Sequence, residues 1–111
     1  MEKSESRTIL VKIVSDGELC YAFPEVASLA SGDFIKFKNE GKGRATILFA
    51  EDSPTSERAV TLDDSGSGSA AEVKFTVNQK TVFAYDVYNH ESDVTAASTM
   101  RPIIIVYPDM D

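Results

Sequence analysis

The chain has 111 residues, of which 42% are hydrophobic and 26% are charged. This length and composition supply one hydrophobic core, so a single domain over residues 1–111 is expected and general disorder is excluded. Eighteen acidic residues against eleven basic ones give a net charge of -7, which disfavours nucleic acid as a partner, because phosphate binding depends on clustered Lys and Arg.

Cys20 is the only cysteine, which excludes an internal disulfide and a structural zinc site built from thiolates. Residues 1–7 are polar, without the apolar stretch of a secretory signal, and no segment reaches the roughly twenty apolar residues that span a bilayer. The sequence as written therefore predicts a cytoplasmic protein without membrane contact. A chain trimmed after a signal peptide, and so periplasmic or secreted, would read the same way.

Apolar and polar residues alternate with a period of two along most of the chain, which is typical of strands with one buried face. In the first such segment, Ile9, Val11 and Ile13 share one face. The strands predicted in chain order are 8–14, 18–23, 26–30, 34–39, 45–50, 71–77, 81–88 and 103–107.

The segment 51–69 is rich in Ser, Asp, Glu and Gly, which predicts a long surface loop with a brief strand or helical turn at 57–62. Residues 1–6 are expected to fray. About seven or eight short strands separated by turns predict an all-β fold, a two-sheet antiparallel Greek-key β-sandwich.

Aromatic residues at alternating positions are expected to fill the core of this sandwich, whereas Tyr88 and Tyr107 could be exposed. The expected core aromatics are Tyr21, Phe23, Phe37, Phe49, Phe75, Phe83 and Tyr85.

Two segments resemble the cupredoxin family, of the plastocyanin and azurin type. In the first, Gly32-Asp33 leads into a strand that ends in Phe37-Lys38-Asn39, and a short loop connects it to the strand 45–50. In the second, the segment 83–90 precedes Met100 and the last strand. The resemblance runs from Ile9 to Val106 and implies a cupredoxin-like fold.

The same resemblance implies where copper ligands would stand. The first histidine position falls on Ala45 and the cysteine position on Val87, while His90 and Met100 match the second histidine and the axial methionine. A blue-copper site needs two imidazoles and a thiolate, so we expect no metal or other cofactor. His90 and Met100 are the residual metal candidates, and nothing in the spacing brings Cys20 to the loop that carries His90.

Other constellations predict no site either. Asp63 to Gly68 resembles the start of a calcium loop, but Lys74 occupies the twelfth position, where a bidentate carboxylate is needed. The acidic residues Glu51, Asp52 and Glu57 lie in the most polar segment, so we expect a solvated rim rather than a catalytic pair.

His90, Ser92 and Asp93 have the residue types of a hydrolase triad. Triad geometry depends on side chains that converge from separate elements, whereas these three lie together on one loop. A surface histidine is the favoured interpretation, and the chain is not expected to be an enzyme.

The predicted function is therefore a non-catalytic cupredoxin-like domain without a functional blue-copper site, acting as a protein-interaction or structural module. Its expected binding surface consists of Arg44, Ala45, Tyr88, His90 and Met100, with a protein as the partner; the oligomeric state is left open. Two alternatives also stay open: a metal-binding or electron-transfer protein with an unconventional site near His90 and Met100, and a small hydrolase that uses His90.

Overall fold

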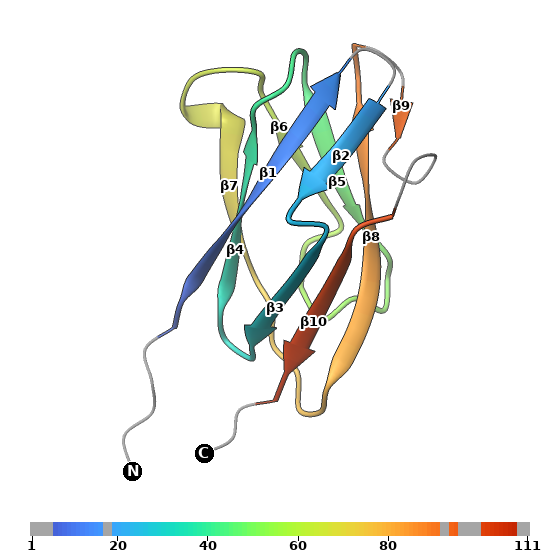
Figure 1. The fold of residues 1–111 in the computed structure, drawn as a ribbon. Coiled ribbons are helices and arrows are strands. Elements are labelled where there is room, and N and C mark those ends of the chain that lie inside the picture. Colours follow the sequence, from blue (N-terminus) through green and yellow to red (C-terminus); the bar gives the residue numbers. More distant parts are fainter. Residues whose placement is uncertain (1–5, 17–18, 92–93, 96–100, 109–111) are drawn as a thin grey trace.

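The computed structural model describes residues 6–16, 19–91, 94–95 and 101–108, and nearly all regular structure in them is strand (Figure 1). The only helical element among these residues is η1, a 3-10 turn at Ser67–Ser69. No helix in the described part of the chain has the length and apolar character needed to cross a membrane. The strands are β1 (Thr8–Asp16), β2 (Leu19–Phe23), β3 (Val26–Ala30), β4 (Phe34–Asn39), β5 (Ala45–Phe49), β6 (Ala59–Leu62), β7 (Ala70–Lys74), β8 (Thr81–Asn89), β9 (Val94–Thr95) and β10 (Ile103–Tyr107).

These strands form two sheets that pack face to face (Figure 1). One sheet has four strands in the order β2-β1-β4-β7, and the other has six, in the order β3-β10-β8-β5-β6 with β9 beside β8. The predicted two-sheet sandwich is confirmed, with ten strands in the described residues rather than seven or eight.

Two pairings differ from a purely antiparallel arrangement, because β1 runs parallel to β4 and β3 runs parallel to β10. Both follow from the place where the chain changes sheets. It leaves the four-stranded sheet after β2 and enters the six-stranded sheet with β3, and Pro24 lies between the two strands. A proline has no N–H to donate, so the ladder of β2 stops there.

The core lies between the sheets and is built from the alternate residues that the sequence pattern predicts. Ile35 and Phe37 of β4 and Ile47 of β5 are all fully buried. The ring of Phe37 lies 6.0 Å from that of Phe49 and 5.5 Å from that of Tyr85, distances at which aromatic pairs attract beyond their burial.

Two predicted core aromatics lie outside the core, because Phe23 is 66% exposed and Tyr21 is only partly buried. The pairing of β1 with β2 places Phe23 opposite Lys12 and Tyr21 opposite Val14, whereas Cys20 and Ala22 fill the buried positions of β2. The two residue rows of β2 do alternate, but the smaller residues face the core and the aromatic residues face outward.

The Gly-Asp turn of the sequence is held by a buried carboxylate. Asp33 is 4% exposed, and its oxygens accept hydrogen bonds from the backbone N–H groups of Arg7, at 2.9 Å, and Ala30, at 3.0 Å. The Arg7 guanidinium lies 3.6 Å from the same carboxylate. Gly32 has a φ of 94°, a conformation that residues with a Cβ rarely adopt, so the turn requires both residues.

The segment 51–69 is less irregular than a long loop would be. It contains β6, at the place where the brief strand is predicted, and Leu62 of this strand is fully buried. The Arg58 guanidinium donates to the carbonyls of Thr55, at 2.9 Å, and Glu51, at 2.8 Å. The Arg58 guanidinium therefore stabilises the turn that leads from β5 into β6.

The outer faces of the two sheets differ in kind. The outer face of the four-stranded sheet, here called the charged face, carries Lys12, Lys36, Lys38, Glu72 and Lys74, and also the exposed apolar residues Leu10 and Phe23. The outer face of the six-stranded sheet, here called the apolar face, is formed mainly by aliphatic and aromatic side chains. Its apolar members include Val26, Leu48, Val82, Ala84, Ile103, Ile105 and Tyr107.

Candidate functional site

The loop end of the sandwich, formed by residues 40–44 and the ends of β5 and β8, brings together most of the predicted surface. The antiparallel register places Ala45 opposite Asn89 and Thr46 opposite Tyr88. The backbone N–H of His90 donates to the carbonyl of Arg44 at 2.8 Å. Arg44, Ala45, Tyr88 and His90 thus come from two neighbouring strands, whereas Met100 lies outside the described residues.

The members of this cluster point to opposite sides of the sheet. Ala45 and Val87 face the core and are fully buried, so the prediction that the Ala45 side chain belongs to the binding surface is wrong. His90 lies on the outer side, where its Nε2 is 2.7 Å from the Thr46 hydroxyl and its ring meets that of Tyr88 edge-on at 4.9 Å. The imidazole therefore reaches the side of β5 opposite to that occupied by the Ala45 methyl group.

Two buried asparagines close the loop end. Asn39 is 3% exposed and Asn89 is 1% exposed. The Asn39 side-chain amide donates to the carbonyls of Gly43, at 2.8 Å, and Asp63, at 3.2 Å, and its oxygen accepts from the Gly41 N–H at 3.0 Å. Neutral amide groups thus satisfy the backbone of the connecting loop.

Asn89 joins the two sheets at the same end. Its amide donates to the Ser15 hydroxyl, at 3.0 Å, and to the Lys42 carbonyl, at 2.9 Å. Its oxygen accepts from the Glu91 N–H at 3.1 Å. Because Ser15 belongs to the four-stranded sheet, this one side chain links both sheets to the loop between them.

Neither asparagine is among the predicted site residues, although the alternation of the sequence carries a signal for both. Asn39 continues the inward row of Ile35 and Phe37, and Asn89 continues that of Tyr85 and Val87. A polar residue at an inward position near a strand end predicts a buried hydrogen-bonding role.

Cys20 lies close to the residue that occupies the cysteine position of the family pattern. Its Sγ is 4.0 Å from the Val87 carbonyl oxygen. Cys20 is the second residue of β2, and β2 packs against β8 of the opposite sheet. Burial, with a smaller contribution from the Asp86 carboxylate, raises the pKa of the Cys20 thiol to about 11.

These residues do not fit a blue-copper ion. The side chains of Ala45 and Val87 hold only carbon, and Cys20 is a thiol at neutral pH, whereas copper requires a thiolate and two imidazoles. In the part of the chain that the structure describes, no three His, Cys, Asp or Glu side chains form a group that could hold a metal ion.

The other sites considered from the sequence have no supporting geometry in the described residues. Asp63 and Asp64 are exposed, and Lys74 lies on β7, on the charged face. Glu51, Asp52 and Glu57 are exposed as well, as expected of a solvated rim. Ser92 and Asp93 lie outside the described residues.

A shallow hollow of about 280 Å³ lies on the apolar face. It is lined by Leu48 to Ala50 of β5 and the loop that follows it, by Ala84 to Asp86 of β8, and by Arg101. This volume is at the lower limit for small-molecule pockets and suits a single large side chain.

Neither a protein-family model nor a curated protein matches the sequence. Solved structures do match the fold. Pseudoazurin from Methylobacterium extorquens AM1 is 22% identical with a TM-score of 0.55, and the match covers 90% of this chain and 75% of that one. Plastocyanin from Dryopteris crassirhizoma is 13% identical with a TM-score of 0.56, covering 87% and 98% of the two chains.

Amicyanin from Paracoccus versutus is similar to the same extent, with 15% identity, a TM-score of 0.53, and coverage of 89% of this chain and 80% of that chain. These likenesses extend over nearly the whole chain, as does the resemblance carried by its sequence motifs. The chain has a cupredoxin-like fold.

Proposed function

We propose that this chain is a non-catalytic cupredoxin-like domain that binds another protein and operates no blue-copper site. One observation carries the proposal: Ala45 and Val87, which occupy the positions of a copper-ligating histidine and cysteine in the family pattern, are carbon-only side chains with no exposed surface. No rotation of these two side chains can supply a donor atom.

The loop end is the surface that we assign to the partner. Arg44 and His90 are exposed there, and Tyr88 is partly buried beside them. This combination of an aromatic ring, a guanidinium and an imidazole is typical of protein-binding surfaces, in which Tyr and Arg are enriched. The side chains of Asn39 and Asn89 hydrogen-bond to the carbonyls of Gly43 and Lys42 in the loop, and a loop that is ordered before binding lowers the entropic cost of binding.

The alternative of an unconventional metal site near His90 and Met100 has less support. The His90 Nε2 is engaged with the Thr46 hydroxyl at 2.7 Å, so metal binding at this nitrogen would first have to break that contact. A cytoplasmic location and the absence of enzymatic activity stay predictions from the sequence.

Affinity capture followed by calorimetry with the purified partner tests the assignment. We expect Arg44→Ala and Tyr88→Ala each to raise the dissociation constant by about tenfold or more, the loss typical of residues that anchor an interface. Lys36→Ala on the charged face is the matched control and should leave the affinity unchanged. Equal affinities for all three variants and the unmodified chain would exclude the loop end as the binding surface.

A further inference from the structure

Four of the six exposed large hydrophobic side chains in the described residues lie on the apolar face, and the other two, Leu10 and Phe23, lie on the four-stranded sheet. Val82 is 57% exposed, Val26 52%, Tyr107 43% and Leu48 40%, and Ile103 and Ile105 are partly exposed between them. Contiguous apolar patches beyond a few hundred Å² on a soluble protein mark a surface that binds something.

The register of β8 and β10 sets the order of side chains on this face. Ile103 lies opposite Ala84 and Ile105 lies opposite Val82. Two residues further along the strands, the apolar rows end in polar groups at both ends. At one end the Lys80 ammonium lies 5.5 Å from the centre of the Tyr107 ring, and at the other end Asp86 and Arg101 line the same hollow.

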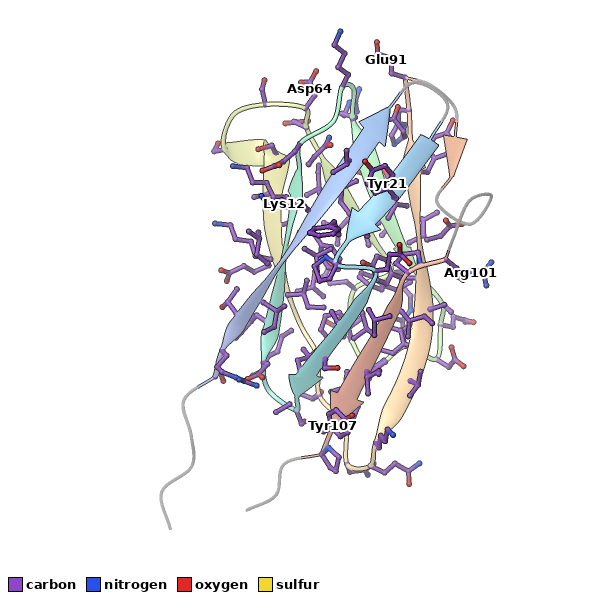
Figure 2. All side chains as sticks on the ribbon, viewed as in Figure 1. Lys12, Tyr21, Asp64, Glu91, Arg101 and Tyr107 are labelled. Carbon is purple, nitrogen blue, oxygen red and sulfur yellow. The ribbon has the colours of Figure 1, made fainter. Side chains whose placement is uncertain are left out.

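This pattern is complementary to itself when it is reversed. Along β8 the outward residues read Lys80, Val82, Ala84 and Asp86, with a cation at one end and an anion at the other. Along β10 they read Arg101, Ile103, Ile105 and Tyr107, with a cation at one end and an aromatic ring at the other. Figure 2 shows Arg101 and Tyr107 at opposite ends of β10.

We propose that the apolar face binds the apolar face of a second copy of this chain, with the strands of the two copies running in opposite directions. The two-fold axis lies between the stacked sheets, perpendicular to the strands, and passes the middle of β8 and of β10. Closed two-fold dimers are the commonest oligomers of soluble proteins, and they require a self-complementary surface of this kind.

Each end of the face then meets its complement. Lys80 of one copy faces Asp86 of the other, and the ring of Tyr107 faces the Arg101 guanidinium, which is a favourable cation–π arrangement. Between them, Ile103 faces Ile105, and Val82 faces Ala84. The hollow of about 280 Å³ beside Arg101 receives the Tyr107 side chain of the second copy.

Charge explains why a second copy is a suitable occupant in spite of the net charge of -7. The central rows of the face carry no charged side chain, so only its two ends bring charges together, and the reversed arrangement pairs opposite signs there. Sheets stacked in this way lie about 10 Å apart with their strands within about 30° of each other.

Analytical ultracentrifugation over a concentration series tests the dimer. We expect the unmodified chain to show a monomer–dimer equilibrium and Val82→Glu to raise its dissociation constant by at least about tenfold, because a carboxylate would be buried in the centre of the interface. Leu10→Glu, a matched change at a position 45% exposed on the other sheet, should leave the equilibrium unchanged. A chain that stays monomeric up to about 1 mM, a concentration at which a dimer with a dissociation constant of about 1 mM would be detected, would overturn the proposal.

A charge exchange tests the orientation independently. Lys80→Glu alone and Asp86→Lys alone each place like charges together and should weaken the homodimer, whereas an equimolar mixture of the two variants pairs opposite charges at both ends and should form a heterodimer. A mixture no more associated than its components, or a dimer insensitive to Val82→Glu, rules out this interface. Circular dichroism and thermal unfolding establish whether each variant is folded. If Asp86→Lys does not fold, the comparison of Val82→Glu with the unmodified chain still tests the interface.

Discussion

The loop end and the apolar face are the two regions in which a function is expected, and they differ in how their groups are satisfied. At the loop end, the side chains of Asn39 and Asn89 are buried and hydrogen-bonded to the loop, and Ala45 and Val87 are sealed in the core. On the apolar face, aliphatic side chains such as Val82 stay in contact with water.

The difference indicates that Ala45 and Val87, at two of the metal-holding positions of the family pattern, are closed off from any ligand. A closed, hydrogen-bonded end can present a rigid surface but offers no open coordination position. An exposed apolar face gains free energy when it is covered, at about 25 cal/mol for each Å² removed from water.

The asparagine network should carry much of the stability of the loop end. Asn89→Leu removes two donors and one acceptor and leaves the Lys42 carbonyl and the Glu91 N–H without their side-chain partner, so we expect a loss of about 3 kcal/mol in the free energy of unfolding. Urea denaturation measures it. Asn78→Leu, at an exposed position, is the control and should change stability by less than about 0.5 kcal/mol; equal effects at the two positions would contradict the account.

The closed end should also control the titration of Cys20. Because burial raises the pKa of this thiol from 9.0 to about 11, the unfolded chain loses the proton at lower pH than the folded chain. The contribution of the protonated thiol to the free energy of unfolding should therefore be fully present below pH 9. It should fall by about 2 kcal/mol as the pH rises towards 11.

Urea unfolding of the unmodified chain and of Cys20→Ala over this pH range isolates the thiol. The variant should lose less stability than the unmodified chain, because other groups titrate equally in both. If the unfolding free energies of the two proteins fell in parallel with pH, the Cys20 thiol would be accessible to water. Slow reaction with a thiol reagent under native conditions is an independent indication of the same closure.

Tyr85 sharpens the comparison, because its backbone lies under the hollow of the apolar face and its side chain enters the core. Its hydroxyl is buried with no hydrogen-bond partner among the described residues, and burial raises the pKa of Tyr85 above its ordinary value. Tyr85→Phe should therefore stabilise the fold by about 1 kcal/mol. Tyr107→Phe is the control at a position 43% exposed, and destabilisation by Tyr85→Phe would show that the hydroxyl has a partner.

The smallest effect is expected at His90. Its imidazole is exposed, and the Thr46 hydroxyl, which lies 2.9 Å from that of Thr61, keeps a partner when the ring is removed. His90→Ala should therefore cost no more than about 1 kcal/mol. A loss of unfolding free energy as large as that of Asn89→Leu would mean that the contacts of His90 stabilise the loop end as much as the buried asparagine does.

The strands and most of the core could be predicted from the sequence, because period-two alternation reports directly which face of each strand is buried. Ile35, Phe37 and Val87 are buried as this pattern indicates. Alternation carries no information on which strands are neighbours, so the parallel pairing of β1 with β4 could not be predicted from it.

The candidate site was less predictable, for related reasons. The family pattern predicts the positions of Ala45 and His90 in the sequence. It does not predict that the Ala45 side chain faces the core while the His90 ring lies on the outer side of the sheet. The approach of Cys20 to Val87 links residues 67 apart in the chain, and only the packing of β2 beside β8 creates it. The apolar face also escaped prediction, because apolar residues in both rows of β10 give no clean alternation to interpret.

Copper titration followed by optical absorption and electron paramagnetic resonance shows whether side chains without donor atoms fill the metal position of the family pattern. We expect no saturable site at stoichiometric copper and no intense blue charge-transfer band. A blue band that saturates at one copper per chain and disappears in Cys20→Ala would contradict this prediction, because the buried thiol would then have become a ligand.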